Sequence, residues 1–204
     1  MIAMSQRNIL YVTSECTPFA QVGGLGDVAS ALPAALRRAG YDIRIVMPLY
    51  GEVDRDALHP IGVSLRIGLA DTVFDARVWQ GELPERVPLY LIDQPDLYAR
   101  SGVYGPKGGA FEDNLLRFAW LSRAACDLPR HVGFAPHVLH ANDWPTALSI
   151  LFAKHLSQPV PTVFTLHNVG YQGIAPLHDF ALTGLPSREL SADSLEHFGA
   201  INLL

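Results

Sequence analysis

The stretch QVGGLGDVASALPAALRRAG, residues 21–40, joins a glycine-rich turn to a helix pattern and decides the fold. From Leu25 onward apolar residues recur at helical spacing, and Gly40 supplies a stop, so the stretch predicts an amphipathic helix with a kink at Pro33. Glycines ahead of a helix leave its first backbone N–H groups open to a phosphate or a sugar. We therefore expect a ligand to approach the main chain at this turn.

Two short apolar runs flank this helix, Asn8–Ser14 before it and Asp42–Pro48 after it. Both are rich in β-branched and aromatic residues, which is typical of strands buried on both faces of a parallel sheet. A strand, a helix and a second strand in this order form a β-α-β unit, whose handedness rule makes the strands parallel. The glycine turn then lies at the carboxyl end of a strand, where open α/β sheets bind ligands.

The rest of the chain continues this alternation with one interruption. Residues 61–93 have partly alternating patterns and predict a β-meander or hairpin before the chain rejoins the parallel sheet. The remaining predictions are a mobile glycine-rich surface loop at 101–111, a helix at 112–128, a strand at 137–141, a helix at 145–156, a strand at 162–167 and short helical pieces after residue 172. The apolar end INLL has no stop signal and looks like a truncation. We expect one α/β domain, residues 1–204, built on a doubly wound, largely parallel sheet.

Composition narrows the class of protein. The 204 residues are 49% hydrophobic and 17% charged, which suffices for one sizeable core. The net charge is −5 and the Lys and Arg residues are scattered, so nucleic acid is not an expected partner. The longest early apolar run is too short for a signal peptide or a membrane span, which predicts a cytoplasmic protein. In that reducing compartment Cys16 and Cys126 are expected to stay unbridged.

Two interpretations compete for the glycine turn. Gly24, Gly26 and Ala29 satisfy the G-x-G-x-x-[GA] dinucleotide pattern formally. However, about ten residues separate the first strand from the helix, whereas that pattern requires a tight turn. The second strand also ends in Met47 and Pro48 instead of the acidic residue that would hold a ribose. A nicotinamide site therefore remains the weaker alternative to a phosphate or sugar site.

Polar and aromatic residues gather where two later strands are predicted to end. One cluster is His140, Asn142, Asp143 and Trp144, and the other is His167, Asn168, Tyr171 and Gln172. Aromatic rings that stack on sugars beside carboxylates and amides that hold hydroxyls suit a carbohydrate. His137, His140 and Asp143 have a superficial metal spacing, but strand residues three apart face opposite sides, so no shared metal is expected. Asp27 is open to two interpretations, a helix cap and an acceptor for sugar hydroxyls.

Several long motifs together resemble a known family. ILYVTSECTPFAQVGGLGDVASALPAAL, EDNLLRF, HANDWPTAL, FTLHNVGYQG and HFGAINLL are similar, in this order and approximate spacing, to the amino-terminal half of bacterial glycogen synthases and plant starch synthases. The resemblance spans nearly all of residues 8–204. It implies a Rossmann-like domain that forms the first half of a glycosyltransferase-B fold.

The resemblance also implies a reaction. Such enzymes move glucose from ADP-glucose to the non-reducing 4-hydroxyl of an α-1,4-glucan with retention of configuration, and they require no metal or other cofactor. Their second, C-terminal domain supplies most nucleotide contacts, so the partners implied here are ADP-glucose, the glucan and that domain. Residues 1–204 alone are expected to be inactive or nearly so.

Roles carry over by position in the motifs. Gln21, Gly23 and Gly24 match the donor phosphate and sugar side, and His167 matches the histidine that contacts the transferred glucose. The acceptor side is expected to comprise Asp27, Asn114, Arg117, Asp143, Trp144, Tyr171 and Gln172. Gln21 stands where the family usually has lysine, and a neutral amide donates weaker hydrogen bonds to phosphate than a cation does.

That departure leaves a second hypothesis open. The chain is alternatively a glucan-binding or regulatory module that keeps the acceptor face and has lost glucose transfer. A donor nucleotide other than ADP is also compatible with Gln21.

Overall fold

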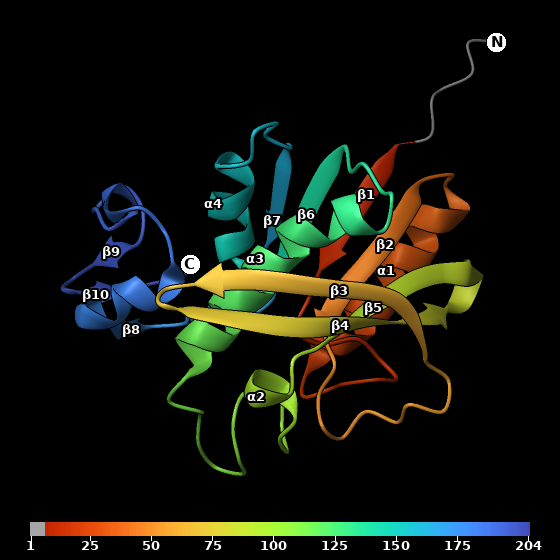
Figure 1. Ribbon diagram of the computed structural model, residues 1–204, viewed down its shortest axis with the longest axis horizontal. Coiled ribbons are helices and arrows are strands. Elements are labelled where there is room, and N and C mark those ends of the chain that lie inside the picture. Colours follow the sequence, from red (N-terminus) through yellow and green to blue (C-terminus); the bar gives the residue numbers. More distant parts are fainter. Residues whose placement is uncertain (1–6) are drawn as a thin grey trace.

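The computed structural model describes residues 7–204, so the first six residues of the expected domain lie outside the described part. A central seven-stranded sheet has the order β3-β4-β5-β2-β1-β6-β7, with helices packed against its faces (Figure 1). The strands are β1 (Asn8–Val12), β2 (Asp42–Pro48), β3 (His59–Leu69), β4 (Thr72–Leu83), β5 (Val87–Asp93), β6 (Val138–Asn142) and β7 (Thr162–Thr165).

Strands β5, β2, β1, β6 and β7 run parallel, and β1 lies in the middle of them. Leu10 of β1 pairs with Arg44 of β2 on one side and with Leu139 of β6 on the other. Tyr11 and Val12 are fully buried, as expected for a strand covered on both faces. The strand order therefore reverses at β1, which confirms the doubly wound sheet and makes the β1/β6 edge a topological switch point.

Strands β3, β4 and β5 form the predicted antiparallel meander, which adds two strands to one edge of the parallel sheet. Side chains of β3 and β4 alternate between buried and exposed, with Leu65 and Val78 on the covered face. One face of this edge is consequently solvated, unlike the parallel centre of the sheet.

The helices are α1 (Gly24–Arg38), α2 (Pro95–Tyr98), α3 (Asn114–His131) and α4 (Leu148–Lys154). Helix α1 continues through Pro33 from the glycine turn to its basic last turn, where Arg37 and Arg38 complement the helix dipole. Helix α3 confirms the helix expected at 112–128 and buries an apolar face formed by Leu115, Phe118, Leu121, Ala125 and Leu128.

The sequence predictions need correction in three places. The expected helix 145–156 is a 3-10 turn, η2 (Trp144–Thr146), followed by the shorter α4, and the expected strand 162–167 ends at Thr165. The segment after residue 172 contains two short 3-10 helices, η3 (Leu177–Thr183) and η4 (Ser187–Glu189). It also contains a small sheet of β8 (Ala175–Pro176), β9 (Glu196–His197) and β10 (Ala200–Ile201). Two-residue strands are too short to produce a periodic pattern. A further 3-10 turn, η1 (Pro84–Arg86), links β4 to β5.

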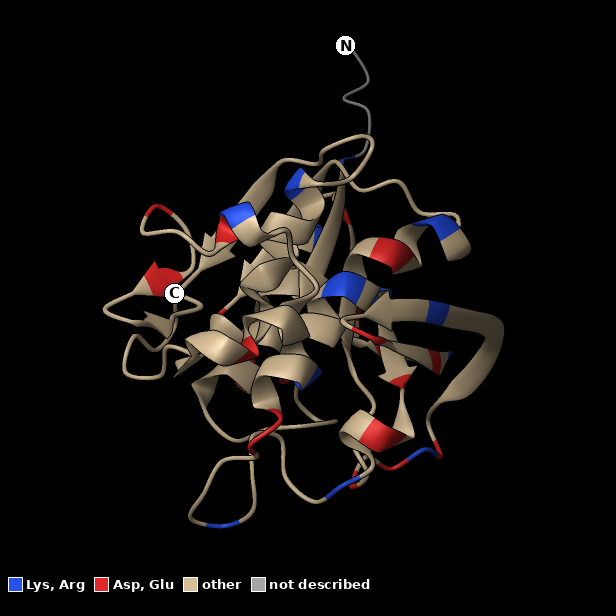
Figure 2. Ribbon diagram, turned by 60° about the vertical axis from the view of Figure 1, so that its left-hand side comes forward, with Lys and Arg blue, Asp and Glu red and all other residues tan. Residues whose placement is uncertain are grey.

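Neither the charged residues nor the two cysteines form a metal-binding cluster in the described part of the chain. Figure 2 shows acidic and basic residues distributed over the helices, strands and loops. Cys16 and Cys126 are free thiols, and burial raises the pKa of each to about 12. Within residues 7–204, none of the helices is long and apolar enough to cross a bilayer.

Candidate functional site

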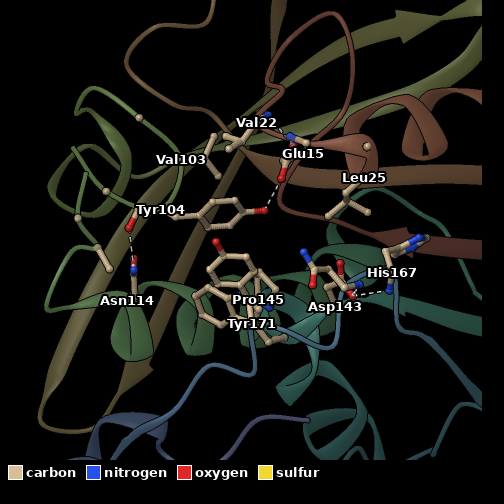
Figure 3. Close-up of a pocket in the computed structure, with 18 of the residues that line it drawn as sticks. Glu15, Val22, Leu25, Val103, Tyr104, Asn114, Asp143, Pro145, His167 and Tyr171 are labelled. Atoms are coloured by element: carbon tan, nitrogen blue, oxygen red, sulfur yellow. Dashed lines mark hydrogen bonds between the residues drawn. The ribbon is translucent and has the colours of Figure 1, made fainter. Parts of the chain in front are cut away.

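A pocket of about 1080 Å³ opens at the carboxyl ends of β1, β6 and β7. Its walls come from the glycine turn before α1, the loop 101–111, the start of α3 and the segments after β6 and β7 (Figure 3). This is the switch point of the sheet, where parallel strands on either side leave a crevice. Segments that lie far apart in the sequence therefore meet at one concave surface.

The glycine turn presents backbone to this pocket. Gly23 has extended backbone angles, φ −140° and ψ −161°, so its conformation does not require glycine. Apart from the chain neighbours and the helix's own backbone, no heavy atom of residues 7–204 lies within 4 Å of a Cβ built on Gly23 or Gly24, so packing does not require glycine either. Gly23 also provides no side-chain cap for α1. What glycine leaves here is open space beside the first N–H groups of a helix, which suits an anion or a sugar.

Asp27 does not cap this helix. Its side chain is exposed in the first turn of α1, and Oδ1 accepts a hydrogen bond from Oγ1 of Thr17 at 3.4 Å. The cap interpretation of Asp27 is therefore wrong. Asp27 also lies outside the set of residues that line the pocket.

Glu15, which the sequence analysis did not single out, holds the glycine turn through hydrogen bonds to its backbone. Its side chain is only 3% exposed. Oε2 accepts hydrogen bonds from the backbone N–H groups of Val22 at 2.6 Å and Gly23 at 3.0 Å. Oε1 accepts a third from the hydroxyl of Tyr104 at 2.5 Å. The buried carboxylate is thereby hydrogen-bonded by three donors and connects the glycine turn to the loop 101–111.

Asp143 has a corresponding role on the other side of the pocket. Its Oδ1 accepts hydrogen bonds from the backbone N–H groups of His167 at 2.6 Å and Asn168 at 3.2 Å. Its own backbone has φ 55° and ψ 176°, a region that residues other than glycine rarely adopt. This backbone conformation directs the Asp143 carboxylate towards the segment after β7. The side chain of Asp143, from one predicted polar cluster, therefore holds the backbone of the other cluster at His167 and Asn168.

The side chain of His167 is oriented by Asn142. Nδ2 of Asn142 donates to the backbone oxygen of Val12 at 3.0 Å, which leaves Oδ1 of Asn142 as an acceptor for Nε2 of His167 at 3.0 Å. Nε2 of His167 therefore carries the proton in the neutral ring, and Nδ1 is the acceptor. Neighbouring His140 contacts Oγ1 of Thr165 at 2.7 Å, and burial, with a smaller contribution from the charge of His167, lowers the pKa of His140.

Aromatic side chains form the floor and one rim of the pocket. The ring of Trp144 packs edge-on against Phe118, with centroids 4.9 Å apart, and tilted against Tyr104 at 5.9 Å. Tyr171, in contrast, is 70% exposed at the mouth. Figure 3 shows Tyr171 and Tyr104 near the same part of the cavity. Rings in such an arrangement offer faces on which a sugar can stack.

Asn114 and Arg117, in the first turns of α3, have different positions. Nδ2 of Asn114 donates to the backbone oxygen of Tyr104 at 2.8 Å, and Asn114 lines the pocket. Arg117 is fully buried, contrary to the solvated side chain that is usual for a helix arginine. It is not among the residues that line the pocket.

Of the eleven residues to which the family resemblance assigns a role, seven line the pocket, namely Gly23, Gly24, Asn114, Asp143, Trp144, His167 and Tyr171. The other four lie outside its lining, namely Gln21, Asp27, Arg117 and Gln172. The exposed side chain of Gln21 donates a hydrogen bond from Nε2 to the backbone oxygen of Gly23, at 3.5 Å. Oε1 of Gln172 accepts a hydrogen bond from Asn202 at 2.7 Å and so ties down the last segment of the chain.

Sequence reasoning missed Glu15 and Tyr104. The only local signal for Glu15 is an acidic residue directly after a strand that is buried on both faces, a position where an unpaired carboxylate would be costly. Tyr104 is an aromatic residue inside a glycine-rich loop that was expected to be mobile surface. Neither signal predicts that Glu15 and Tyr104 contact each other, because the two residues are 89 positions apart in the sequence.

A doubly wound sheet whose switch-point crevice combines a glycine turn, a helix N-terminus and a polar, aromatic rim defines a Rossmann-like ligand-binding domain. The comparisons with known proteins agree. The model of the starch synthase catalytic domain matches residues 8–204, and the chain belongs to that family.

Relatives and a solved structure support this assignment. The chain is 38% identical over 205 residues to the glycogen synthase of Syntrophotalea carbinolica and 39% identical over 204 residues to glycogen synthase 2 of Geobacter metallireducens. These alignments cover 97% and 96% of the chain but 42% of each relative. The catalytic domain of starch synthase IV from Arabidopsis thaliana, solved bound to ADP and acarbose, superposes with a TM-score of 0.87 at 27% identity, over 98% of this chain and 42% of that one.

Proposed function

We propose that this chain forms the acceptor-side domain of a retaining, cytoplasmic glucosyltransferase that moves glucose from ADP-glucose to the non-reducing 4-hydroxyl of an α-1,4-glucan. The observation that carries the proposal is the pocket of about 1080 Å³ in which the glycine turn, Asp143 and His167 meet. The chain spans about 42% of the length of its curated relatives. A second, C-terminal domain is accordingly part of the proposal.

The proposed chemistry is electrostatic and positional. Backbone N–H groups at the start of α1, beside Gly23 and Gly24, stabilise the charge that develops on the departing diphosphate. His167 orients the transferred glucose, while Trp144 and Tyr171 stack against sugar rings of the acceptor. The C-terminal domain supplies the remaining nucleotide contacts and covers the pocket, which excludes water from the reacting centre. No covalent nucleophile is part of this scheme.

Calorimetric titration of the 204-residue chain tests the binding half of the proposal. We expect maltoheptaose to bind and NAD to leave the heat signal unchanged. Asp143→Ala removes the anchor of the pocket and should weaken maltoheptaose binding, whereas Asp75→Ala, on the exposed face of the meander, should not. Binding of NAD without any response to maltoheptaose would replace this proposal with the nicotinamide alternative.

Complementation tests the catalytic half. The chain alone should not elongate glucan from ADP-glucose, because half of the proposed cleft is absent. Fused to the C-terminal part of glycogen synthase 2 from Geobacter metallireducens, it should do so. Glucan elongation by the unfused chain at the rate of the fusion would contradict the two-domain scheme.

The second candidate function, a glucan-binding module without transferase activity, is favoured by Gln21. This exposed side chain brings no positive charge to the glycine turn. In the fusion, Gln21→Lys should raise turnover with ADP-glucose if the chain is a weakened transferase. A fusion that binds maltoheptaose but transfers no glucose with either residue at position 21 supports the binding module instead.

A further inference from the structure

Arg117 is a buried cation without a carboxylate partner. The residue is 0% exposed, and among residues 7–204 no acidic side chain lies within ion-pair distance of it. Its Nε donates to the backbone oxygen of Leu97 at 2.8 Å, and Nη1 donates to the backbone oxygen of Val103 at 3.0 Å and to Oδ1 of Asn114 at 2.6 Å. Nη2 is buried without a hydrogen-bond partner in the described chain. Burial lowers the pKa of this guanidinium.

Such an arrangement is costly for a residue that only fills space. Apolar side chains of similar volume often replace buried charged groups without loss of stability. The guanidinium carbon lies 4.8 Å from the ring centre of Phe111 and 5.2 Å from that of Phe118, and these cation–π contacts offset only part of the desolvation. What an apolar side chain cannot do is hold the carbonyl groups of two different segments at once.

The two segments are the end of α2 and the loop 101–111. Arg117 holds the loop directly through the oxygen of Val103. It also occupies Oδ1 of Asn114, which directs Nδ2 of Asn114 to the backbone oxygen of Tyr104. Consecutive carbonyl groups of the loop are thus fixed from one turn of α3. Tyr104 then extends into the pocket to reach Glu15.

We propose that Arg117 is a positioning residue that holds the loop 101–111 as a wall of the pocket and thereby sets the affinity for the glucan. The glucan part of this inference rests on the proposed function. The guanidinium fork is the feature that matters, since one planar group with a fixed geometry satisfies three acceptors. Lysine keeps the charge but lacks this fork.

Hydrogen exchange measured by mass spectrometry on the 204-residue chain tests the anchoring. Arg117→Lys should accelerate amide exchange in residues 101–111 by about tenfold or more, the factor that corresponds to losing a buried hydrogen bond to a charged group. Arg123→Lys is the matched control, because Arg123 lies on the same helix and stacks on Phe152 away from the loop. Exchange in the loop should be unchanged in this control. Equal exchange rates in wild type and Arg117→Lys would overturn the proposal.

Titration with maltoheptaose tests the consequence for binding. Arg117→Lys should weaken the affinity by about tenfold, with Arg123→Lys unchanged. Faster loop exchange with unaltered affinity would overturn the role in glucan binding. If the wild-type chain itself does not bind maltoheptaose, the proposed function fails, and the exchange experiment still decides whether Arg117 anchors the loop.

A second variant covers the case in which Arg117→Lys does not fold. Asn114→Asp keeps an acceptor for Arg117 but removes the donor to the oxygen of Tyr104. It should accelerate exchange at the amides around Tyr104 and leave α2 protected. Unchanged exchange around Tyr104 would contradict the proposed chain of contacts.

Discussion

The hydroxyl of Tyr104 donates a hydrogen bond of 2.5 Å to Oε1 of Glu15, and the two residues are 89 positions apart in the chain. The other oxygen of the same carboxylate accepts hydrogen bonds from the backbone of Val22 and Gly23. One buried side chain therefore sets the distance between the glycine turn and the loop 101–111. The opposing walls of the pocket are coupled through this single group.

Tyr104→Phe is expected to lower the free energy of unfolding by about 1.5–3 kcal/mol, since it removes a hydrogen bond to a buried charged group and keeps the ring. Burial and the neighbouring Glu15 raise the pKa of Tyr104, so the hydroxyl is protonated and available as a donor at neutral pH. Urea unfolding measures the effect. Tyr171→Phe, at an exposed position, is the control and should change stability by less than about 0.5 kcal/mol. Equal stability of the two variants would argue against the Glu15 anchor.

Two glycines of the turn should respond differently to alanine. At Gly24 the added Cβ meets open space at the start of α1, so Gly24→Ala should keep or raise stability by about 0.4–1 kcal/mol. Under the proposed function, the methyl group should nevertheless weaken binding of ADP-glucose to the fusion with the C-terminal part of glycogen synthase 2, because it covers the exposed backbone. At Gly26 a Cβ lies 3.1 Å from Oγ1 of Thr17 and 3.3 Å from the oxygen of Ala20. Gly26→Ala should therefore lower the melting temperature.

Thermal unfolding and ADP-glucose titration distinguish the two effects. A Gly24→Ala variant that binds ADP-glucose as well as the parent would show that no ligand approaches the main chain at this point. Loss of stability in Gly24→Ala, without such loss in Gly26→Ala, would contradict the packing described here.

Asp143 should tolerate asparagine better than alanine. Asn keeps an Oδ1 acceptor for the backbone N–H groups of His167 and Asn168, whereas Ala leaves both without a partner. Asp143→Ala is expected to cost about 2 kcal/mol or more in urea unfolding, and Asp143→Asn about half of that. If the alanine variant is as stable as the asparagine variant, these two hydrogen bonds do not stabilise the segment after β7.

Stability should fall in mild acid partly because of His140. Burial and the nearby His167 lower the pKa of His140 below its ordinary value of about 6.5, so the unfolded chain binds the proton more readily. The contribution of neutral His140 is thus present above about pH 6.5 and is lost as the pH falls through the folded pKa. His140→Gln should flatten the dependence of the unfolding free energy on pH between about 7 and 5.

The exposed His178 provides the comparison, with a side chain that is 81% accessible. His178→Gln should leave the pH dependence as it is in the wild type. A steeper acid loss in His140→Gln than in the wild type would show that the sign argued for His140 is wrong.

The sequence by itself determined the βαβ order, the parallel centre of the sheet, the meander and the place of the glycine turn. These features depend on local patterns, such as the unbroken apolar runs of β1 and β2 and the helical spacing after Leu25. The doubly wound arrangement then follows from handedness and brings the polar clusters around Asp143 and His167 to one edge. The sequence therefore predicted that the glycine turn and these two polar clusters lie at the same edge of the sheet.

Only the tertiary structure decided which side chains hold that edge together. Glu15 meets Tyr104 across 89 residues, and Arg117 turns inward to bind carbonyl groups of α2 and the loop 101–111. No local pattern encodes such contacts, because a carboxylate or a guanidinium has the same helix or strand preference whether it is solvated or buried. Its partner exists only once the chain has folded, and the desolvation of the buried charge makes that partner necessary.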